Sequence, residues 1–193
     1  MSIAFDLAIF FITLVLTVRF FRKDGAWNAE KGKIAFRFFT VQSNVLCALS
    51  ALLLCLFPGS RAVWLLKYAG TAAVSVTMLT VLFYLGPLFG YKKLLSGGDL
   101  FMHLITPLLA LVSFCAFEKR GLAFSEALWG LAPVILYGAL YMYRVVFCPR
   151  VAPEKAWDDF YGFNNTGKYY LSAAVMAAGT FLICLGLMAL QNL

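Results

Sequence analysis

The sequence predicts an all-α polytopic membrane protein, with six transmembrane helices bundled around an intramembrane pocket. Hydrophobic residues make up 63% of the 193 positions and charged residues only 13%, and the mean hydropathy is +0.86. A soluble domain of this size could not bury that much apolar surface, so the excess must face lipid. Because the connections between the apolar runs are short, we expect one transmembrane domain over residues 1–193.

Each predicted span is an apolar run of about 20 residues, the length that crosses the hydrocarbon core of a bilayer. The first run is not preceded by a basic residue and not followed by a small-residue cleavage site, so we expect a true span rather than a signal peptide. Glycine and proline separate the runs, at Asp24-Gly25, Pro58-Gly59, Gly97-Gly98, Gly121 and Pro149/Pro153. The six predicted spans cover residues 3–21, 36–57, 63–87, 100–117, 126–147 and 167–190.

Basic residues predict the orientation of the chain. Twelve of the sixteen lysines and arginines flank the first, third and fifth connections, and the opposite side has Arg61, Lys67, Lys119 and Arg120. By the positive-inside rule, the odd-numbered connections lie in the cytoplasm and both termini lie outside. Because the basic residues flank apolar runs, we expect the bilayer as partner and no nucleic acid.

No metal or cofactor is expected. A single histidine without an intramembrane carboxylate cluster cannot form an ordinary metal site. The five cysteines lie in or beside apolar runs without a CxxC pair, which is typical of buried structural thiols.

Polar residues within the spans indicate where a function would lie, because a polar side chain in hydrocarbon costs free energy unless it is hydrogen-bonded. They recur at helical spacing and predict polar helix faces around one pocket. The rows include Arg37, Thr40, Asn44 and Cys47; Ala73, Thr77, Thr80 and Tyr84; Asp99, His103, Thr106 and Ala110; Tyr137, Tyr141 and Arg144; and Lys168, Tyr169, Tyr170 and Ser172.

Ordinary helix packing accounts for part of this pattern. Small and hydroxyl residues are common at transmembrane helix contacts, and we expect that role for Ser75, Thr77 and Thr80. Aromatic residues near the ends of spans are typical of the interfacial belt, which we expect to contain Trp64, Tyr68, Trp129 and Trp157.

Two polar residues have matching depths in the membrane. Thr40 lies three residues inside Arg37 and His103 lies four inside Asp99, which places them roughly 4.5 and 6 Å from the same edge. A threonine hydroxyl is a weak nucleophile until a base accepts its proton, and histidine suits that task. The alternative is that His103 is an interfacial hydrogen-bonding residue, as a lone histidine near a helix end commonly is.

Five further residues are candidates for the same site. Asn44, one turn below the hydroxyl, and Ser43 beside it are candidates for orienting it or donating to an oxyanion. Arg144 is a candidate for binding a carboxylate or phosphate headgroup. Tyr84 and Tyr141 end their helices on the same side and are candidates for substrate binding or for packing.

Two segments resemble a known family. Residues 36–44 (FRFFTVQSN) and 102–109 (MHLITPLL) are similar to the signature regions of the androgen-induced-gene family of multispanning membrane hydrolases, which act on fatty acid esters of hydroxy fatty acids. The spacing of the spans is most similar to the short bacterial members. The resemblance implies a bacterial cell membrane, a threonine nucleophile at Thr40 and a histidine acting with it at His103. Residues 158–168 (DDFYGFNNTGK) do not resemble the animal enzymes, so the substrate remains open.

The sequence therefore predicts an intramembrane hydrolase of lipid esters that uses Thr40 as nucleophile and His103 as base. One alternative is a lipid acyltransferase with the same pair, in which a lipid hydroxyl or amine replaces water. The other is a non-catalytic lipid-binding or transport protein. Ion-coupled transport is disfavoured because eight of the nine acidic residues lie in connections or at helix ends, and Asp6 lies near the outer end of the first helix.

Overall fold

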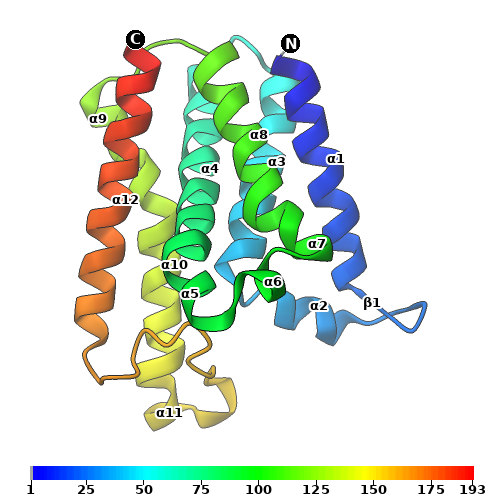
Figure 1. Ribbon diagram of the computed structural model, residues 1–193, viewed down its shortest axis with the longest axis vertical. Helices are drawn as coiled ribbons and strands as arrows, with labels where there is room; N and C mark the ends of the chain where they lie inside the picture. Colours follow the sequence, from blue (N-terminus) through cyan, green and yellow to red (C-terminus); the bar gives the residue numbers. More distant parts are fainter. Residues whose placement is uncertain (1) are drawn as a thin grey trace.

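The computed structural model describes residues 2–193 as an all-α bundle (Figure 1). Six helical spans are long and apolar enough to cross a bilayer, so the predicted class, a polytopic membrane protein, is confirmed. The predicted ends differ from the observed ones by no more than four residues. We number the spans 1 to 6: Ser2–Phe20, Phe39–Leu56, Arg61–Phe89, Gly97–Phe117, Phe124–Val151 and Tyr169–Asn192.

Spans 1, 2 and 6 are the single helices α1, α3 and α12, whereas spans 3 to 5 change their hydrogen-bonding pattern along their length. Span 3 contains α4 (Arg61–Thr80), η1 (Val81–Leu85) and α5 (Gly86–Phe89). Span 4 contains α7 (Gly97–Leu100), η2 (Phe101–Ile105), α8 (Thr106–Val112) and η3 (Ser113–Phe117). Span 5 contains α9 (Phe124–Ala127), η4 (Leu128–Leu131), α10 (Ala132–Met142), η5 (Tyr143–Phe147) and α11 (Cys148–Val151).

Prolines explain three of the π-helical turns. A proline has no N–H to donate to the carbonyl four residues earlier, and a local π turn is one way a helix accommodates that gap. Pro87, Pro107 and Pro149 each follow a π turn by two residues, and the carbonyls they leave without an α-helical partner are at the centres of η1, η2 and η5. The central residue of η2 is His103, so the widened turn surrounds the histidine.

The first connection is more structured than predicted. It contains a short hairpin of β1 (Arg22–Lys23) and β2 (Ala26–Trp27), followed by α2 (Ala29–Ala35). The Oδ1 atom of Asn28 caps α2 by accepting from the N–H of Lys31 at 2.8 Å. Span 2 starts three residues later than predicted, because Phe36, Arg37 and Phe38 lie between α2 and α3.

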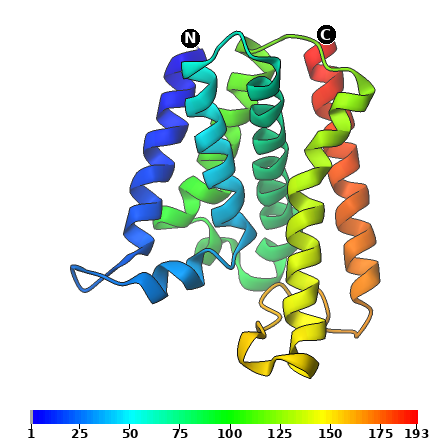
Figure 2. The same cartoon turned by 180° about the vertical axis from the view of Figure 1, so that it is seen from behind.

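Both termini lie at one end of the bundle, which we call the terminal end (Figures 1 and 2). At the opposite end, which we call the loop end, lie α2, α6 (Tyr91–Leu94) and the fifth connection, residues 152–168 with η6 (Pro153–Lys155). The first, third and fifth connections therefore share one end of the molecule.

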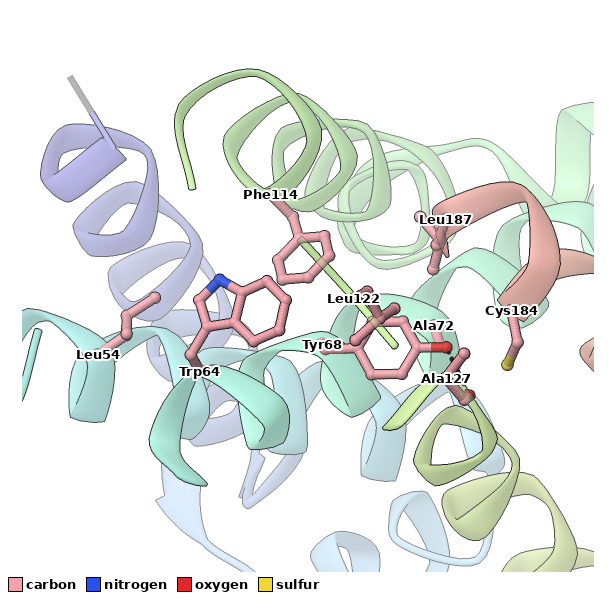
Figure 3. Packing of buried hydrophobic residues seen from close by; sticks show 9 residues of the cluster. All are labelled: Leu54, Trp64, Tyr68, Ala72, Phe114, Leu122, Ala127, Cys184 and Leu187. Atoms are coloured by element: carbon pink, nitrogen blue, oxygen red, sulfur yellow. Dashed lines mark hydrogen bonds between the residues drawn. The ribbon is translucent and has the colours of Figure 1, made fainter. Parts of the chain in front are cut away.

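Helix α4 forms the centre of the bundle, and two of its aromatic residues are not interfacial. Trp64 and Tyr68 are fully buried and pack against Phe114 (Figure 3). The indole of Trp64 donates to the carbonyl of Glu118 at 2.8 Å, and the Tyr68 hydroxyl donates to that of Ala127 at 2.7 Å. The prediction of an interfacial belt was wrong for both, because the end of span 4, the start of span 5 and span 6 cover the face of α4 that carries them.

The other two tryptophans lie in different surroundings. Trp129 is 63% exposed, as an interfacial residue would be. Trp157 packs in the fifth connection instead, with the guanidinium groups of Arg37 and Arg144 at 6.0 and 5.7 Å from its ring centre.

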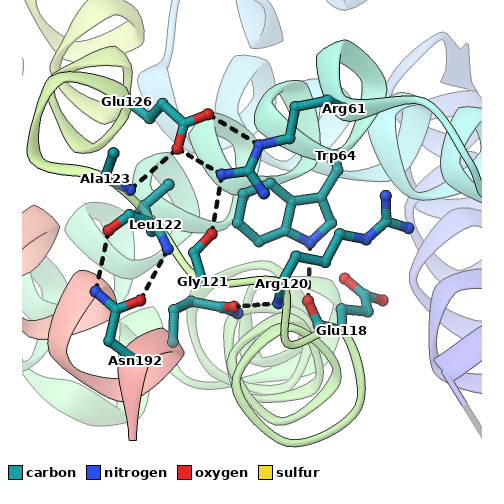
Figure 4. A network of polar contacts seen from close by, with 10 residues as sticks. Arg61, Trp64, Glu118, Arg120, Gly121, Leu122, Ala123, Glu126 and Asn192 are labelled. Atoms are coloured by element: carbon teal, nitrogen blue, oxygen red, sulfur yellow. Dashed lines mark hydrogen bonds and ion pairs between the residues drawn. The ribbon is translucent and has the colours of Figure 1, made fainter.

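A polar network closes the terminal end (Figure 4). Arg61 pairs with Glu126 and lies over the Trp64 ring at 4.3 Å. Asn192 accepts from the N–H of Leu122 at 2.9 Å and donates to its carbonyl at 3.0 Å. These bonds fix the end of α12 to the fourth connection and the start of span 3 to the start of span 5.

Lys67 was expected at a membrane surface, with the other basic residues of the terminal end. Its side chain is instead fully buried. It forms an ion pair with Asp6 and lies 3.9 Å from the carboxylate of Glu118. Ser113 donates to Glu118 at 2.7 Å. Burial raises the pKa of Glu118 to about 7, although the Lys67 ammonium opposes that rise. The sequence pattern gave no sign that these three charges from different segments meet.

Candidate active site

The structure brings Thr40 and His103 together at the loop end. Thr40 is the second residue of α3, which begins directly after the extended residue Phe38. Its Oγ1 atom lies 3.4 Å from Nε2 of His103. The histidine side chain is 8% exposed, so little water competes for this contact.

The third connection fixes the orientation of the His103 ring. Nδ1 of the imidazole lies 2.6 Å from the carbonyl oxygen of Leu94, the last residue of α6. A carbonyl only accepts, so Nδ1 carries the hydrogen and donates it. In the neutral ring, the Nε2 lone pair then faces the Thr40 hydroxyl, which is the arrangement a general base needs.

Asn44 joins the two segments that carry this pair. Its Nδ2 atom donates to the carbonyl of Thr40 at 2.8 Å and to the carbonyl of Met102 at 3.0 Å. Both amide hydrogens are thus used by the backbone, and neither remains for an oxyanion. Of the two roles expected for Asn44, positioning fits and oxyanion donation does not.

Ser43 contributes to packing between α3 and α4. Its hydroxyl lies 2.9 Å from that of Thr77 and donates to the Thr40 carbonyl at 3.2 Å. The Thr77 hydroxyl also donates to the carbonyl of Ala73 at 3.3 Å. Ser43 therefore bonds to the backbone of Thr40 and not to its hydroxyl.

The fifth connection supplies a residue that the sequence analysis did not select. The hydroxyl of Tyr161 accepts from the backbone N–H of Phe39 at 2.9 Å. Burial raises the pKa of Tyr161, and the hydrogen bond from the backbone N–H of Phe39 opposes that rise. Thr40, the next residue, contacts the imidazole of His103 through its own hydroxyl. In the sequence, residues 158–168 were noted only because they do not resemble the animal enzymes. A loop has no helical periodicity, so the sequence could not predict that Tyr161 lies beside Thr40.

Two more phenols bond segments near Thr40: Tyr141 bonds the fifth connection, and Tyr137 bonds the residues before α3. The Tyr141 hydroxyl donates to Asp159 at 2.8 Å and accepts from the N–H of Tyr161 at 3.1 Å. Tyr137 donates to the carbonyl of Arg37 at 2.7 Å. Asp159 also accepts from the backbone N–H groups of Phe163 and Asn164. Tyr161 is therefore positioned by bonds to spans 2 and 5.

A cavity of about 440 Å³ begins at Thr40. It is lined by spans 2, 3, 5 and 6 and by the fifth connection, whereas span 4, whose polar row was also expected around the pocket, contributes no lining residue. None of its lining residues carries a charge. The wall includes Thr40, Thr77, Val81, Leu85, Val134, Ile135, Gly138, Met142, Tyr161, Ala173 and Met176.

The cavity reaches the lipid-facing surface between α10 and α12. Two of its lining residues, Ile135 on α10 and Tyr170 on α12, are 54% and 57% exposed. In a bilayer these exposed residues would contact acyl chains. The cavity is thus open towards the surface that would face lipid.

Arg144 and Tyr84 do not line the cavity. The Arg144 guanidinium donates to the carbonyl of Lys155 at 3.1 Å, and the Tyr84 hydroxyl donates to that of Tyr161 at 3.3 Å. Both residues were predicted to bind substrate, but their contacts are with the fifth connection. Tyr141 does line the cavity, although its hydroxyl is engaged by Asp159.

All five cysteines are free thiols. Within residues 2–193, no group of three or more histidine, cysteine, aspartate or glutamate residues is arranged to hold a metal ion. The side chains that lie around the start of α3 carry hydroxyl, imidazole and phenol groups.

Comparison with known proteins found no matching protein-family model, no matching curated protein and no matching solved structure. The fold and the site together define a six-span membrane protein with a part-buried threonine–histidine contact, whose threonine lines an apolar cavity.

Proposed function

We propose that this protein is an intramembrane hydrolase of lipid esters, such as fatty acid esters of hydroxy fatty acids, with Thr40 as nucleophile and His103 as base. The observation that carries the proposal is the imidazole bonded through Nδ1 to the Leu94 carbonyl, with Nε2 directed to the Thr40 hydroxyl beside an apolar cavity. A base fixed by a third group next to a hydroxyl is the arrangement of an activated nucleophile.

The first half-reaction forms an acyl-threonine. Thr40 Oγ1 bonds to the ester carbonyl carbon while its proton passes to His103 Nε2, and the carbonyl π electrons move to the oxygen. When the tetrahedral intermediate collapses, the bond to the alcohol oxygen breaks, and His103 returns the proton to that oxygen. The alcohol leaves, and the acyl group remains on Thr40.

The second half-reaction repeats these steps with water. His103 accepts a proton from water as its oxygen bonds to the acyl carbon, and collapse breaks the bond to Thr40 Oγ1. The proton then returns to Thr40, and the free acid leaves. If a lipid alcohol replaced water, the same steps would give acyl transfer.

The cavity supports a neutral substrate with a long acyl chain. Its wall is largely apolar and uncharged, with few hydroxyl groups besides those at the Thr40 end, as ligand sites for apolar molecules commonly are. An acyl chain entering between α10 and α12 would place its ester near Thr40 without crossing water.

The charge distribution supports a cytoplasmic loop end in a bacterial cell membrane, the compartment implied by the family resemblance. With Lys67 buried, the terminal end retains only Arg61, Lys119 and Arg120 as basic side chains near its surface. The twelve basic residues around the odd-numbered connections remain at the loop end. Under the positive-inside rule, substrate would be hydrolysed in the cytoplasmic half of the bilayer.

Labelling with a lipophilic fluorophosphonate, followed by peptide mapping, tests the nucleophile. We expect the label on Thr40 and no label in Thr40→Ala. Label at another residue of an active preparation would refute the assignment. Incubating the purified protein with an ester and an acceptor alcohol then distinguishes hydrolysis, which releases free acid, from acyl transfer, which yields a new ester.

A further inference from the structure

One component of ester hydrolysis has no donor among the residues expected from the sequence. The tetrahedral intermediate carries a negative oxygen, which active sites stabilise with positioned hydrogen-bond donors. The amide hydrogens of Asn44 are used by two backbone carbonyls, and the Ser43 hydroxyl is bonded within the α3–α4 contact. A donor for this oxygen has to come from elsewhere on the wall beside Thr40.

Three phenols lie around the start of α3, and their hydrogen bonds distinguish them. The hydroxyl hydrogens of Tyr137 and Tyr141 are donated to the Arg37 carbonyl and to Asp159. The hydroxyl of Tyr161 accepts from Phe39, and across residues 2–193 no acceptor is bonded to its hydrogen. Tyr161 therefore has the one phenolic hydrogen of the three that is available to a ligand.

The position of that hydroxyl fits the reaction. Its oxygen lies on the N-terminal end of α3, one residue from Thr40, and both residues line the cavity. Bonds donated to a phenol oxygen at the positive end of a helix make its hydrogen a stronger donor. The ring is packed against Phe38 and Phe163 and is held from behind by Tyr141, so the hydroxyl is fixed before substrate arrives.

We propose that Tyr161 is a further catalytic residue, whose hydroxyl donates a hydrogen bond to the carbonyl oxygen of the ester as that oxygen becomes negative. This inference rests on the proposed ester hydrolysis. Tyr161 transfers no proton in this role: the hydrogen bond strengthens as charge develops and weakens as the intermediate collapses.

The test measures kcat and KM for a long-chain ester in wild type, Tyr161→Phe and Thr40→Ala. Removing one oxyanion donor typically lowers kcat by about 10²–10³-fold, and we expect that loss in Tyr161→Phe with KM changed less than about threefold. Tyr143→Phe is the matched control, since Tyr143 is 48% exposed and lies away from the cavity; it should keep wild-type kcat.

A second variant separates donation from packing, because Tyr161→Phe also leaves the Phe39 N–H without its acceptor. Replacing Tyr161 with 4-aminophenylalanine restores an N–H donor at the same place, and it should recover at least about tenfold of the lost kcat. Full kcat in Tyr161→Phe, or no recovery with the amino analogue in a folded protein, would overturn the role of Tyr161 while Thr40→Ala stays inactive. No ester hydrolysis by wild type would instead refute the proposed function itself, and this inference with it.

Discussion

His103 and Leu94 are joined by a 2.6 Å hydrogen bond from the imidazole Nδ1 to the backbone carbonyl, although nine residues separate them in the chain. The bond crosses from η2 to α6, so the third connection decides which ring nitrogen faces Thr40. His103→Asn separates the two roles of the ring, which are donation to Leu94 and acceptance of a proton. An asparagine amide can still donate to the Leu94 carbonyl but offers no basic nitrogen. We expect turnover to fall by about 10²–10⁴-fold with little change in Tm. His103→Ala should lose both activity and stability. Turnover at the wild-type rate in His103→Asn would argue against a base at this position.

Thr40 and His103 should behave as one unit. Thr40→Ala and His103→Ala should each remove most turnover, and the double variant should cost little more than either alone, because residues that act in one step are not additive. Thr40→Ser keeps a hydroxyl and should retain part of the activity. Losses that multiply in the double variant would indicate two independent roles.

Asn44→Asp should destabilise the protein without a change in side-chain size. The carboxylate would face the carbonyls of Thr40 and Met102, to which Asn44 now donates. Losing buried donors in this way costs about 1–3 kcal/mol per unsatisfied group, and thermal unfolding in detergent should show a lower Tm. The nearby Ser43→Ala removes a weaker contact and should have the smaller effect; the reverse order would contradict the positioning role of Asn44.

Gly138→Leu should shorten the acyl chain that the protein accepts. Gly138 lines the cavity, and a Cβ atom there would meet nothing within 4 Å. The added side chain can therefore extend into the space expected for the lipid tail, and kcat/KM should fall for long esters more than for short ones. Gly186→Leu is the control, since Gly186 also has open space around its Cα but lies away from the cavity. Equal losses for all chain lengths would place the tail elsewhere.

Glu118 should make the stability depend on pH. Its pKa is raised by burial from an ordinary 4.5 to about 7, so the folded state holds the proton more tightly than the unfolded state. The resulting stability is present below the unfolded pKa and is lost as pH rises through about 7. Because one pKa unit is about 1.4 kcal/mol, Tm should fall by several degrees between about pH 5 and pH 8. Glu118→Gln should flatten that slope, and an unchanged slope would assign it to another group.

The spans were predictable because lipid imposes a length and a composition on each of them. The pairing of Thr40 with His103 was predictable for a related reason, since the ends of apolar runs fix depth along the membrane normal. Rotation about the helix axis is only partly constrained in this way. The rows containing Asn44, Cys47 and Thr106 do face inward. Four of the five rows contribute lining residues to the cavity, and only the row of span 4 does not.

What the sequence did not predict depends on contacts between distant segments. Trp64, Lys67 and Tyr68 lie within about the first two turns of α4, where a surface position is the usual expectation. Other spans cover the face of the helix that carries them. Tyr161 lies in a connection without helical periodicity, and only its bonds to Phe39 and Tyr141 place it beside Thr40. Helix propensity and hydropathy contain no information on such partners.

The π turn around His103 also determines which side of span 4 the residues before it face. A π turn holds one residue more than the corresponding α turn, and each residue of an α-helix rotates the chain by about 100°. The side chains before η2 therefore point in directions that are shifted around the helix axis by one residue, relative to the row that continues through Thr106 and Ala110. Deleting Phe101, the first residue of η2, would leave the helix beyond Pro107 unchanged. It would turn the preceding residues, and the connection that contains Leu94, away from the imidazole.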